Sequence, residues 1–130
     1  MCRNAKGFTL IELLVVVVII SILAAIAIPK FVSTKEQAYL SNMKSDLRNL
    51  ATAQEAYSSD NGGYYNGPVP NAALIYNPSA SVTIALANVT ATGWAATAQV
   101  PGMTPRTCSI YFGTGGPLGP ATIEGRIACT

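Results

Sequence analysis

The stretch FTLIELLVVVVIISILAAIAI, residues 8–28, decides the fold of this chain. Its only polar members are Thr9, Glu12 and Ser21. A helix of this length rises about 31 Å at ~1.5 Å per residue, which is the thickness of the hydrocarbon core of a bilayer. The sequence therefore predicts a membrane-spanning helix close to the N-terminus.

The charges on either side of this stretch predict its orientation. Arg3 and Lys6 precede it, and Lys30 follows it. By the positive-inside rule, the N-terminus lies in the cytoplasm and everything after Lys30 lies outside the membrane.

Composition narrows the classes of function. Of the 130 residues, 50% are hydrophobic and 11% are charged, and the formal net charge is +2, too small to indicate a nucleic-acid groove. The chain has no histidine, which removes the commonest general base, Ser–His and Cys–His nucleophile pairs, and most zinc and haem sites. We expect a protein that is not an enzyme, with no catalytic residues, no metal site and no cofactor.

Three interpretations of the apolar stretch compete. It is an ordinary signal peptide cleaved after Ala27, a plain membrane anchor, or the body of a protein whose leader is removed before the apolar residues. Glu12 decides among them, because a carboxylate one turn into an apolar helix is costly in lipid. Neither a signal peptide nor a simple anchor has a use for that charge, so the third interpretation is favoured.

The residues GFTLIE, 7–12, resemble the processing motif of the type IV pilin and pseudopilin family. The resemblance covers residues 1 to about 60 closely. It implies that a prepilin peptidase cleaves between Gly7 and Phe8 and that Phe8 becomes an N-methylated N-terminus. It makes Glu12 the glutamate at the fifth mature position, and Pro29 the proline that ends the first half of the helix.

Cleavage would create a positive amine at Phe8, and an unpaired charge of either sign is costly away from water. Glu12 lies one turn from Phe8 and could pair with its own amine or with the amine of a neighbouring subunit. In the second arrangement the carboxylate sets the axial register between subunits, because only a subunit at the correct height along the filament neutralises it. Phe8, Glu12 and Pro29 are therefore the expected assembly residues.

One helix is expected to pass through Pro29, with a bend or local loosening there because proline removes a backbone donor. Beyond it, apolar side chains recur at helical spacing on one face: Leu40, Met43, Leu47, Leu50 and Tyr57. The expected organisation is a leader (1–7), a transmembrane or filament-core half-helix (8–29), an amphipathic half-helix (30–60) and a globular β head (61–130) that opens with a loop (61–81).

Alternating apolar residues predict four short strands in the head, at 81–89, 93–100, 108–112 and 121–129. A four-stranded antiparallel sheet packed on the amphipathic half-helix would bury one face of each. The predicted fold class is α+β and type IV pilin-like.

Cys108 and Cys129 are expected to form a disulfide, because this part of the chain lies in an oxidising compartment. The bridge would close a loop of about 22 residues and contribute on the order of 3 kcal/mol. In the family, such a bridge often pins the C-terminal loop against the sheet. Two free buried thiols are the alternative.

The resemblance implies a major-type pilin, the structural subunit of a type IV pilus used for motility, adhesion or DNA uptake. Its partners would be identical subunits in a helical homopolymer, the prepilin peptidase and methyltransferase, and an inner-membrane assembly platform. It would lie in the inner membrane before assembly and in an extracellular filament afterwards, with no specific nucleic-acid site.

Two alternatives stay open. The first is a major pseudopilin of a type II secretion system, although the head lacks the group of carboxylates that usually binds calcium in those proteins. The second is a small secreted binding module released by cleavage after Ala27.

Overall fold

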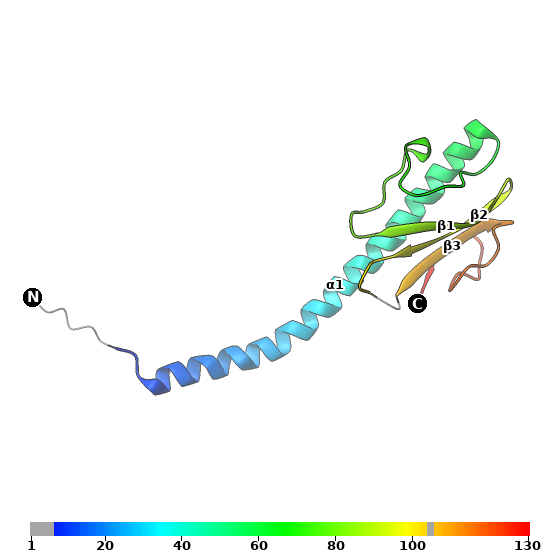
Figure 1. Ribbon diagram of the computed structural model, residues 1–130. Coiled ribbons are helices and arrows are strands. Elements are labelled where there is room, and N and C mark those ends of the chain that lie inside the picture. The colour runs from blue at the N-terminus through cyan, green and yellow to red at the C-terminus, as the bar shows by residue number, and fades with distance from the viewer. Residues whose placement is uncertain (1–6, 104–105) are drawn as a thin grey trace, which may run out of the picture. The chain divides into compact units, whose positions relative to one another are not determined.

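The computed structural model describes residues 7–103 and 106–130, and the expectations for Arg3 and Lys6 lie outside that part of the chain. The chain forms two compact units, Met1–Lys35 and Glu36–Thr130. We call the second unit the head unit. Figure 1 shows the long helix and the strands of the sheet.

The helix α1 (Leu10–Asn61) passes through Pro29 without a break. The prediction of one continuous helix is therefore confirmed. By length and composition, α1 carries a stretch near the N-terminus that is apolar enough to cross a membrane. Every large apolar side chain between Leu10 and Ile28 is exposed, because no other element of the first unit covers it.

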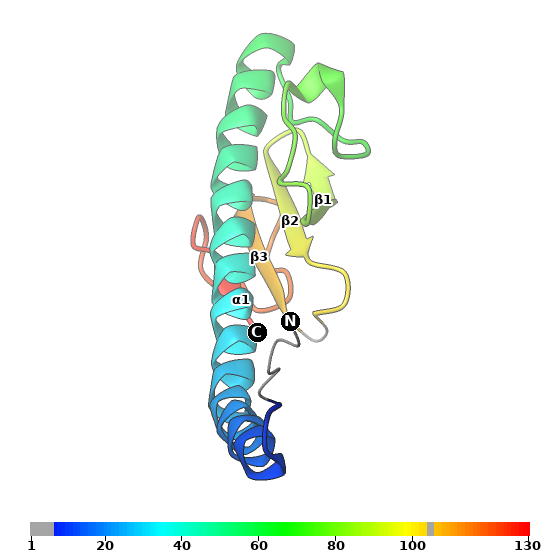
Figure 2. The same cartoon turned by 90° about the vertical axis from the view of Figure 1, so that its left-hand side faces the viewer.

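The head unit contains one antiparallel sheet in the order β1-β2-β3-β4. Its strands are β1 (Thr83–Thr90), β2 (Gly93–Gln99), β3 (Thr107–Gly113) and β4 (Ala128–Cys129). The predicted α+β fold with a four-stranded antiparallel sheet is confirmed. Figure 2 shows the same elements from the side, with β1, β2 and β3 beside α1.

The core of the head unit lies between α1 and one face of the sheet. Met43, Leu47 and Leu50 on the helix are fully buried, as the apolar periodicity predicts. Trp94 is the largest fully buried side chain, and its ring lies 5.2 Å from that of Phe112. Small side chains follow Trp94 along the same face of β2, so the helix can approach the backbone of this central strand closely.

The opposite face of the sheet is covered by the segment that follows β3. Ala95 and Ser109 on that face are fully buried. Gly115 lies directly over β2, where a Cβ atom on this residue would stand 2.3 Å from the carbonyl oxygen of Trp94. The glycine-rich run after β3 is therefore a second covering layer whose close approach requires glycine at position 115.

The last strand is much shorter than predicted: β4 covers Ala128–Cys129, whereas the sequence pattern predicted a strand over 121–129. Turns take up the backbone hydrogen bonds that a strand would need. Ala121 and Leu118 bond each other in both directions, and the N–H of Arg126 donates to the carbonyl of Ile123. Gly125, at φ +70°, ends that turn in a conformation that favours glycine.

A bulge interrupts the pairing of β1 with β2 between Ala87 and Thr90. Asn88 within it has a φ of +48°, which asparagine tolerates better than most residues. The predicted alternation along β1 therefore holds only up to the bulge.

Candidate functional site

The start of α1 is fixed by a reciprocal pair of contacts between Thr9 and Glu12. The backbone N–H and the hydroxyl of Thr9 each donate to Oε2 of Glu12, both at 2.8 Å. The N–H of Glu12 donates in return to the hydroxyl of Thr9 at 3.3 Å. This is a capping box, in which two residues three apart satisfy backbone donors that the helix leaves free.

The capping box gives Glu12 a local role in starting the helix, in addition to the expected pairing of its charge with a Phe8 amine. One oxygen of its carboxylate is committed to Thr9, and the other has no partner among the described residues. Helix initiation alone would be served by glutamine at this position, because an amide oxygen accepts the same bond. The negative charge itself is therefore not explained by the cap.

The bond between Gly7 and Phe8 precedes α1 and lies in exposed, non-helical backbone. Phe8 is 90% exposed. A Cβ atom added to Gly7 would meet nothing within 4 Å. Packing against the described residues thus does not require glycine at position 7.

Two further features shape the apolar part of α1. The hydroxyl of Ser21 donates to the carbonyl of Val17 at 2.7 Å, so this polar group is satisfied within the helix. Pro29 lacks an N–H, so the carbonyl of Ala25 receives no helical bond from it. The sequence would thus allow the apolar part of α1 to lie in lipid, with its weakest backbone bonding near Pro29.

In the head unit, the loop after α1 is tied to the helix by Gln54, which is fully buried. Its side-chain amide donates to the carbonyl of Tyr65 at 3.0 Å and accepts from the N–H of Tyr65 at 2.9 Å. The side chain thereby pairs with the loop as a neighbouring strand would. Figure 2 shows this loop, in green, beside the end of α1.

A second tie joins the same loop to Asp46, which is only 4% exposed. Its carboxylate accepts from the N–H of Ser79 at 3.0 Å and from the hydroxyl of Ser79 at 3.2 Å. The phenol of Tyr76 donates to the backbone carbonyl of Asp46 at 2.8 Å. Burial, together with the nearby Asp46 carboxylate, raises the pKa of Tyr76 above its ordinary value.

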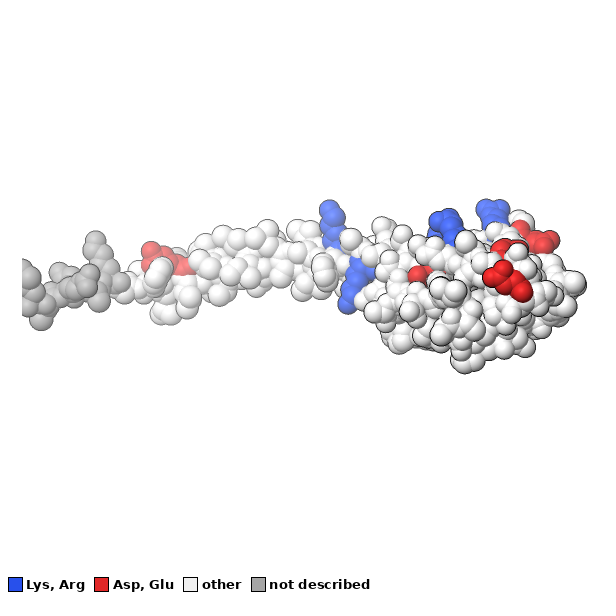
Figure 3. Space-filling view, turned by 90° about the horizontal axis from the view of Figure 1, so that it is seen from above, with Lys and Arg blue, Asp and Glu red and all other residues white. Residues whose placement is uncertain are grey.

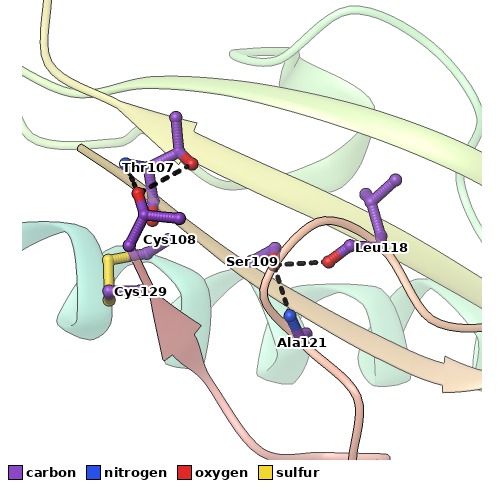
Figure 4. Close-up of a disulfide and its surroundings, with 7 residues drawn as sticks. Thr107, Cys108, Ser109, Leu118, Ala121 and Cys129 are labelled. Atoms are coloured by element: carbon purple, nitrogen blue, oxygen red, sulfur yellow. Dashed lines mark hydrogen bonds between the residues drawn. A yellow bond between two sulfur atoms is a disulfide. The ribbon is translucent and has the colours of Figure 1, made fainter. Parts of the chain in front are cut away.

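The C-terminal end is tied to β3 by a disulfide between Cys108 and Cys129, which are also direct partners in the sheet. Figure 4 shows this disulfide beside hydrogen bonds that also hold the C-terminal segment to β3. The N–H of Thr130 donates to the carbonyl of Thr107 at 2.9 Å. The buried hydroxyl of Ser109 donates to the carbonyl of Leu118 at 2.6 Å and accepts from the N–H of Ala121 at 3.1 Å.

Charged side chains of both signs lie on the face of the head unit drawn in Figure 3. On the face drawn in Figure 3, basic side chains lie along one edge and most acidic side chains gather toward the far end. Arg106 forms an ion pair with Glu36, with 3.5 Å between the guanidinium nitrogen and the carboxylate oxygen. That same part of the chain contains no group of three or more His, Cys, Asp or Glu side chains arranged to hold a metal.

Sequence reasoning identified the apolar face of α1 but missed its buried polar members. Asp46 and Gln54 lie at the same helical spacing as Met43, Leu47 and Leu50, and a polar residue at such a position is the signal that could have found them. The pattern Thr9-x-x-Glu12 likewise announces a capping box.

Comparison with known proteins bears on the same regions. Residues 2–28 match the family model for the prokaryotic N-terminal methylation motif. The chain is similar to the type II secretion system core protein G of Pseudomonas aeruginosa, with 40% identity over 77 residues, 59% of this chain and 54% of that protein. It thus spans about half the length of that relative.

Two relatives are pilins by name. The type IV major pilin protein PilA of Myxococcus xanthus is 50% identical over 62 residues, which cover 48% of this chain and 28% of that one. The type IV wide pilus major component PilA4 of Thermus thermophilus is 37% identical over 93 residues, 71% of each chain. With that coverage and the pilin-like α+β fold, the chain belongs to the type IV pilin and pseudopilin family.

Proposed function

We propose that this protein is a major-type pilin, the structural subunit of a type IV pilus filament that serves surface functions such as motility, adhesion or DNA uptake. A prepilin peptidase removes residues 1–7, and Phe8 becomes the N-methylated first residue. The subunit waits in the inner membrane, anchored by residues 8–29, and polymerises with identical subunits through this segment.

The observation that carries the proposal is the apolar surface of α1 in the first unit. Its large side chains are all about half exposed or more, with exposed fractions from 47% for Val17 to 89% for Leu10. A surface of this extent is not stable in water and needs lipid or other protein around it. The two pilin relatives and the methylation motif support an order of events in which this segment lies first in lipid and afterwards in the filament.

The exposed bond at Gly7 supports the site of cleavage. Since a side chain at position 7 would meet nothing within 4 Å, a requirement for glycine there would come from the peptidase. The cut leaves Thr9 and Glu12 in place with the backbone N–H of Thr9 intact, so the capping box survives it. A mature subunit can therefore keep the same helix start.

Intact mass and N-terminal sequencing of protein sheared from cells test this proposal. The expected product starts at methylated Phe8 and carries two hydrogens fewer than the dithiol form. A product that starts at Ile28 would instead identify a secreted module released by cleavage after Ala27, and it would overturn the proposal.

The role of Glu12 in assembly has its own test, because the capping box can be separated from the charge. Glu12→Gln keeps an acceptor for the N–H of Thr9 but removes the negative charge. If pairing with a neighbour's Phe8 amine sets the register, this variant accumulates in the membrane and yields few filaments. Wild-type filament yield from Glu12→Gln would show that the charge has no such role.

A second candidate is a major pseudopilin of a type II secretion system, favoured by the 40% identity to a core protein G over 77 residues. A pseudopilin is expected to support secretion of exoproteins without releasing filaments when cells are sheared. Filament recovery at native expression, together with unchanged secretion in a deletion strain, distinguishes the pilin.

A further inference from the structure

The head unit has a basic cleft on one flank of α1, where the helix meets the end of β3 and the C-terminal segment. Its volume is about 410 Å³. Three of its lining residues are cations: Lys44 and Arg48 from the helix and Arg126 from the segment before β4. Its floor is apolar and includes Ile110, Phe112 and Ile127.

The cations of the cleft are not neutralised within the chain. Lys44 and Arg48 stand four residues apart on one helix face, a spacing at which like charges repel. No carboxylate lies within 4.0 Å of Lys44, Arg48 or Arg126 in the described residues. Bringing three like charges together is unfavourable in the isolated subunit and would be relieved by an anionic partner.

The opposite flank of α1 carries complementary chemistry. Asp60 lies in the last turn of the helix, which contains no basic residue, and the helix dipole disfavours a negative charge there. Asp60 lines a groove beside the loop residue Ile75. At ~100° per residue, Asp60 is turned by about 120° from Arg48, so the two stand on different flanks.

Ile75 is the second unusual feature of that flank. Its side chain is 91% exposed, the most of any large apolar residue in the head unit. Its backbone is left-handed, with φ 51° and ψ 43°, a conformation that is costly for a β-branched residue. The left-handed backbone ends the turn Ala72–Leu74, where the N–H of Ile75 donates to the carbonyl of Ala72 at 3.2 Å. Glycine or asparagine would serve there at lower cost, and nothing among the described residues of the head unit covers the apolar side chain.

We propose that the basic cleft of one subunit binds the flank formed by Asp60 and Ile75 of a second copy of this chain. Asp60 of the second copy meets Lys44, Arg48 and Arg126, and Ile75 enters over the apolar floor. This inference rests on the proposed filament and adds to it a specific lateral contact between heads.

The geometry fits an open polymer. The two surfaces differ and lie on different flanks, so each subunit can use one surface toward the preceding copy and the other toward the next. Contacts of this heterologous kind produce helical filaments when the rotation between copies does not close a ring. Because Arg48 and Asp60 are separated by twelve residues, parallel copies would be staggered by about 18 Å along the helix.

A charge exchange in the full-length chain tests the contact. Arg48→Glu places a negative charge opposite Asp60, and the ratio of sheared to cellular pilin should fall by about tenfold or more. Adding Asp60→Lys restores an opposite pair, and the ratio should return to near wild type.

The matched control is Arg48→Glu combined with Glu55→Lys. This variant has the same net charge as the exchanged pair, but Glu55 lies on the flank of the cleft, only about 20° from Arg48 around the helix. Because Glu55 also accepts a hydrogen bond from the hydroxyl of Tyr64 at 3.0 Å, the urea midpoint of Glu55→Lys alone is measured beside it to exclude a loss of fold. It should not restore filaments. Equal rescue by Glu55→Lys, or wild-type filaments from Arg48→Glu alone, would overturn the proposed contact.

Ile75→Asn separates the fold from the contact. Asparagine tolerates the left-handed conformation, so the head unit of this variant should unfold at the same or higher urea concentration. Its filament yield should nevertheless fall. A loss of stability accompanied by unchanged filaments would contradict the role given to Ile75.

Cysteines at Ala51, in the cleft, and at Ile75 provide a direct measurement. Oxidation of filaments of the Ala51→Cys/Ile75→Cys variant should give a ladder of covalent multimers, whereas Ala51→Cys alone should not. Filaments without a ladder would refute this lateral contact and leave the proposed pilin function intact. Absence of wild-type protein from the sheared fraction would refute the proposed function itself.

Discussion

The carboxylate of Asp46 accepts two hydrogen bonds from Ser79, 33 residues further along the chain, and so ties the middle of α1 to the end of the loop before β1. Both groups lie in the head unit. The tie is polar, partly buried and made by the side chain of one helix residue, so it can be removed without changing the apolar core.

Asp46→Ala should lower the free energy of unfolding by about 1–3 kcal/mol, because the partly buried N–H of Ser79 loses its partner. Urea unfolding of the full-length protein in detergent, followed by the fluorescence of the buried Trp94, measures this. Asp60→Ala is the matched control on the same helix and should change the value by less than about 0.5 kcal/mol. Equal effects of the two variants would contradict a structural role for Asp46.

The phenol of Tyr76 predicts a dependence of stability on alkaline pH. Its pKa is raised in the folded state, first by burial and then by Asp46. In the unfolded chain the phenol ionises at about pH 10, whereas in the folded protein it still holds its proton at that pH. Its contribution to the free energy of unfolding is therefore complete below about pH 10 and is lost as the pH rises further.

Tyr76→Phe should therefore show a shallower decline in stability above about pH 10 than the wild type. At neutral pH it should be less stable by about 0.5–1.5 kcal/mol, because the bond to the carbonyl of Asp46 is lost. Unfolding curves at a series of pH values for both proteins give the difference. Parallel curves would mean that Tyr76 does not titrate differently in the two states.

The disulfide should contribute measurably to the head unit. Replacing Cys108 and Cys129 together by alanine is expected to lower the free energy of unfolding by about 3 kcal/mol in the chain-entropy model. Wild-type protein treated with a reductant should behave in the same way, which separates the bridge from the loss of the two side chains. An unchanged unfolding midpoint after reduction would argue against this contribution.

The capping box at the start of α1 predicts a difference between two small changes at Thr9. Thr9→Ser keeps the hydroxyl acceptor, whereas Thr9→Ala removes it and should speed hydrogen exchange of the first helical amides by about fivefold. Exchange measured by NMR in micelles reports this directly. Identical exchange in the two variants would show that the cap is not what holds the first turn.

The helix and the sheet could be predicted because they depend on periodic apolar residues. Met43, Leu47 and Leu50 mark the buried face of α1, and alternation marks the first three strands. The prediction of a last strand over 121–129 was wrong, because the alternation does not reveal the turns at Leu118–Ala121 and at Gly125. These turns use backbone N–H and carbonyl groups that a strand would need.

The polar ties were out of reach for a different reason. Apolar periodicity finds residues that leave water, but it does not say which polar groups will meet far along the chain. The partners of Asp46 and Gln54, Ser79 and Tyr65, lie in a loop without periodicity. Their positions follow only once the sheet is in place.

The bulge in β1 has a consequence for a protein that works at very high local concentration. In the described residues, β2 is the only strand that pairs with β1, so β1 is an edge of the sheet. A long regular edge would invite strand-to-strand pairing between adjacent subunits, the arrangement that leads to amyloid. The irregularity between Ala87 and Thr90 breaks the row of donors and acceptors, and the opposite edge, β4, is only two residues long. Both edges are thus poor templates, and copies held close together have little opportunity to stick to one another through their sheets.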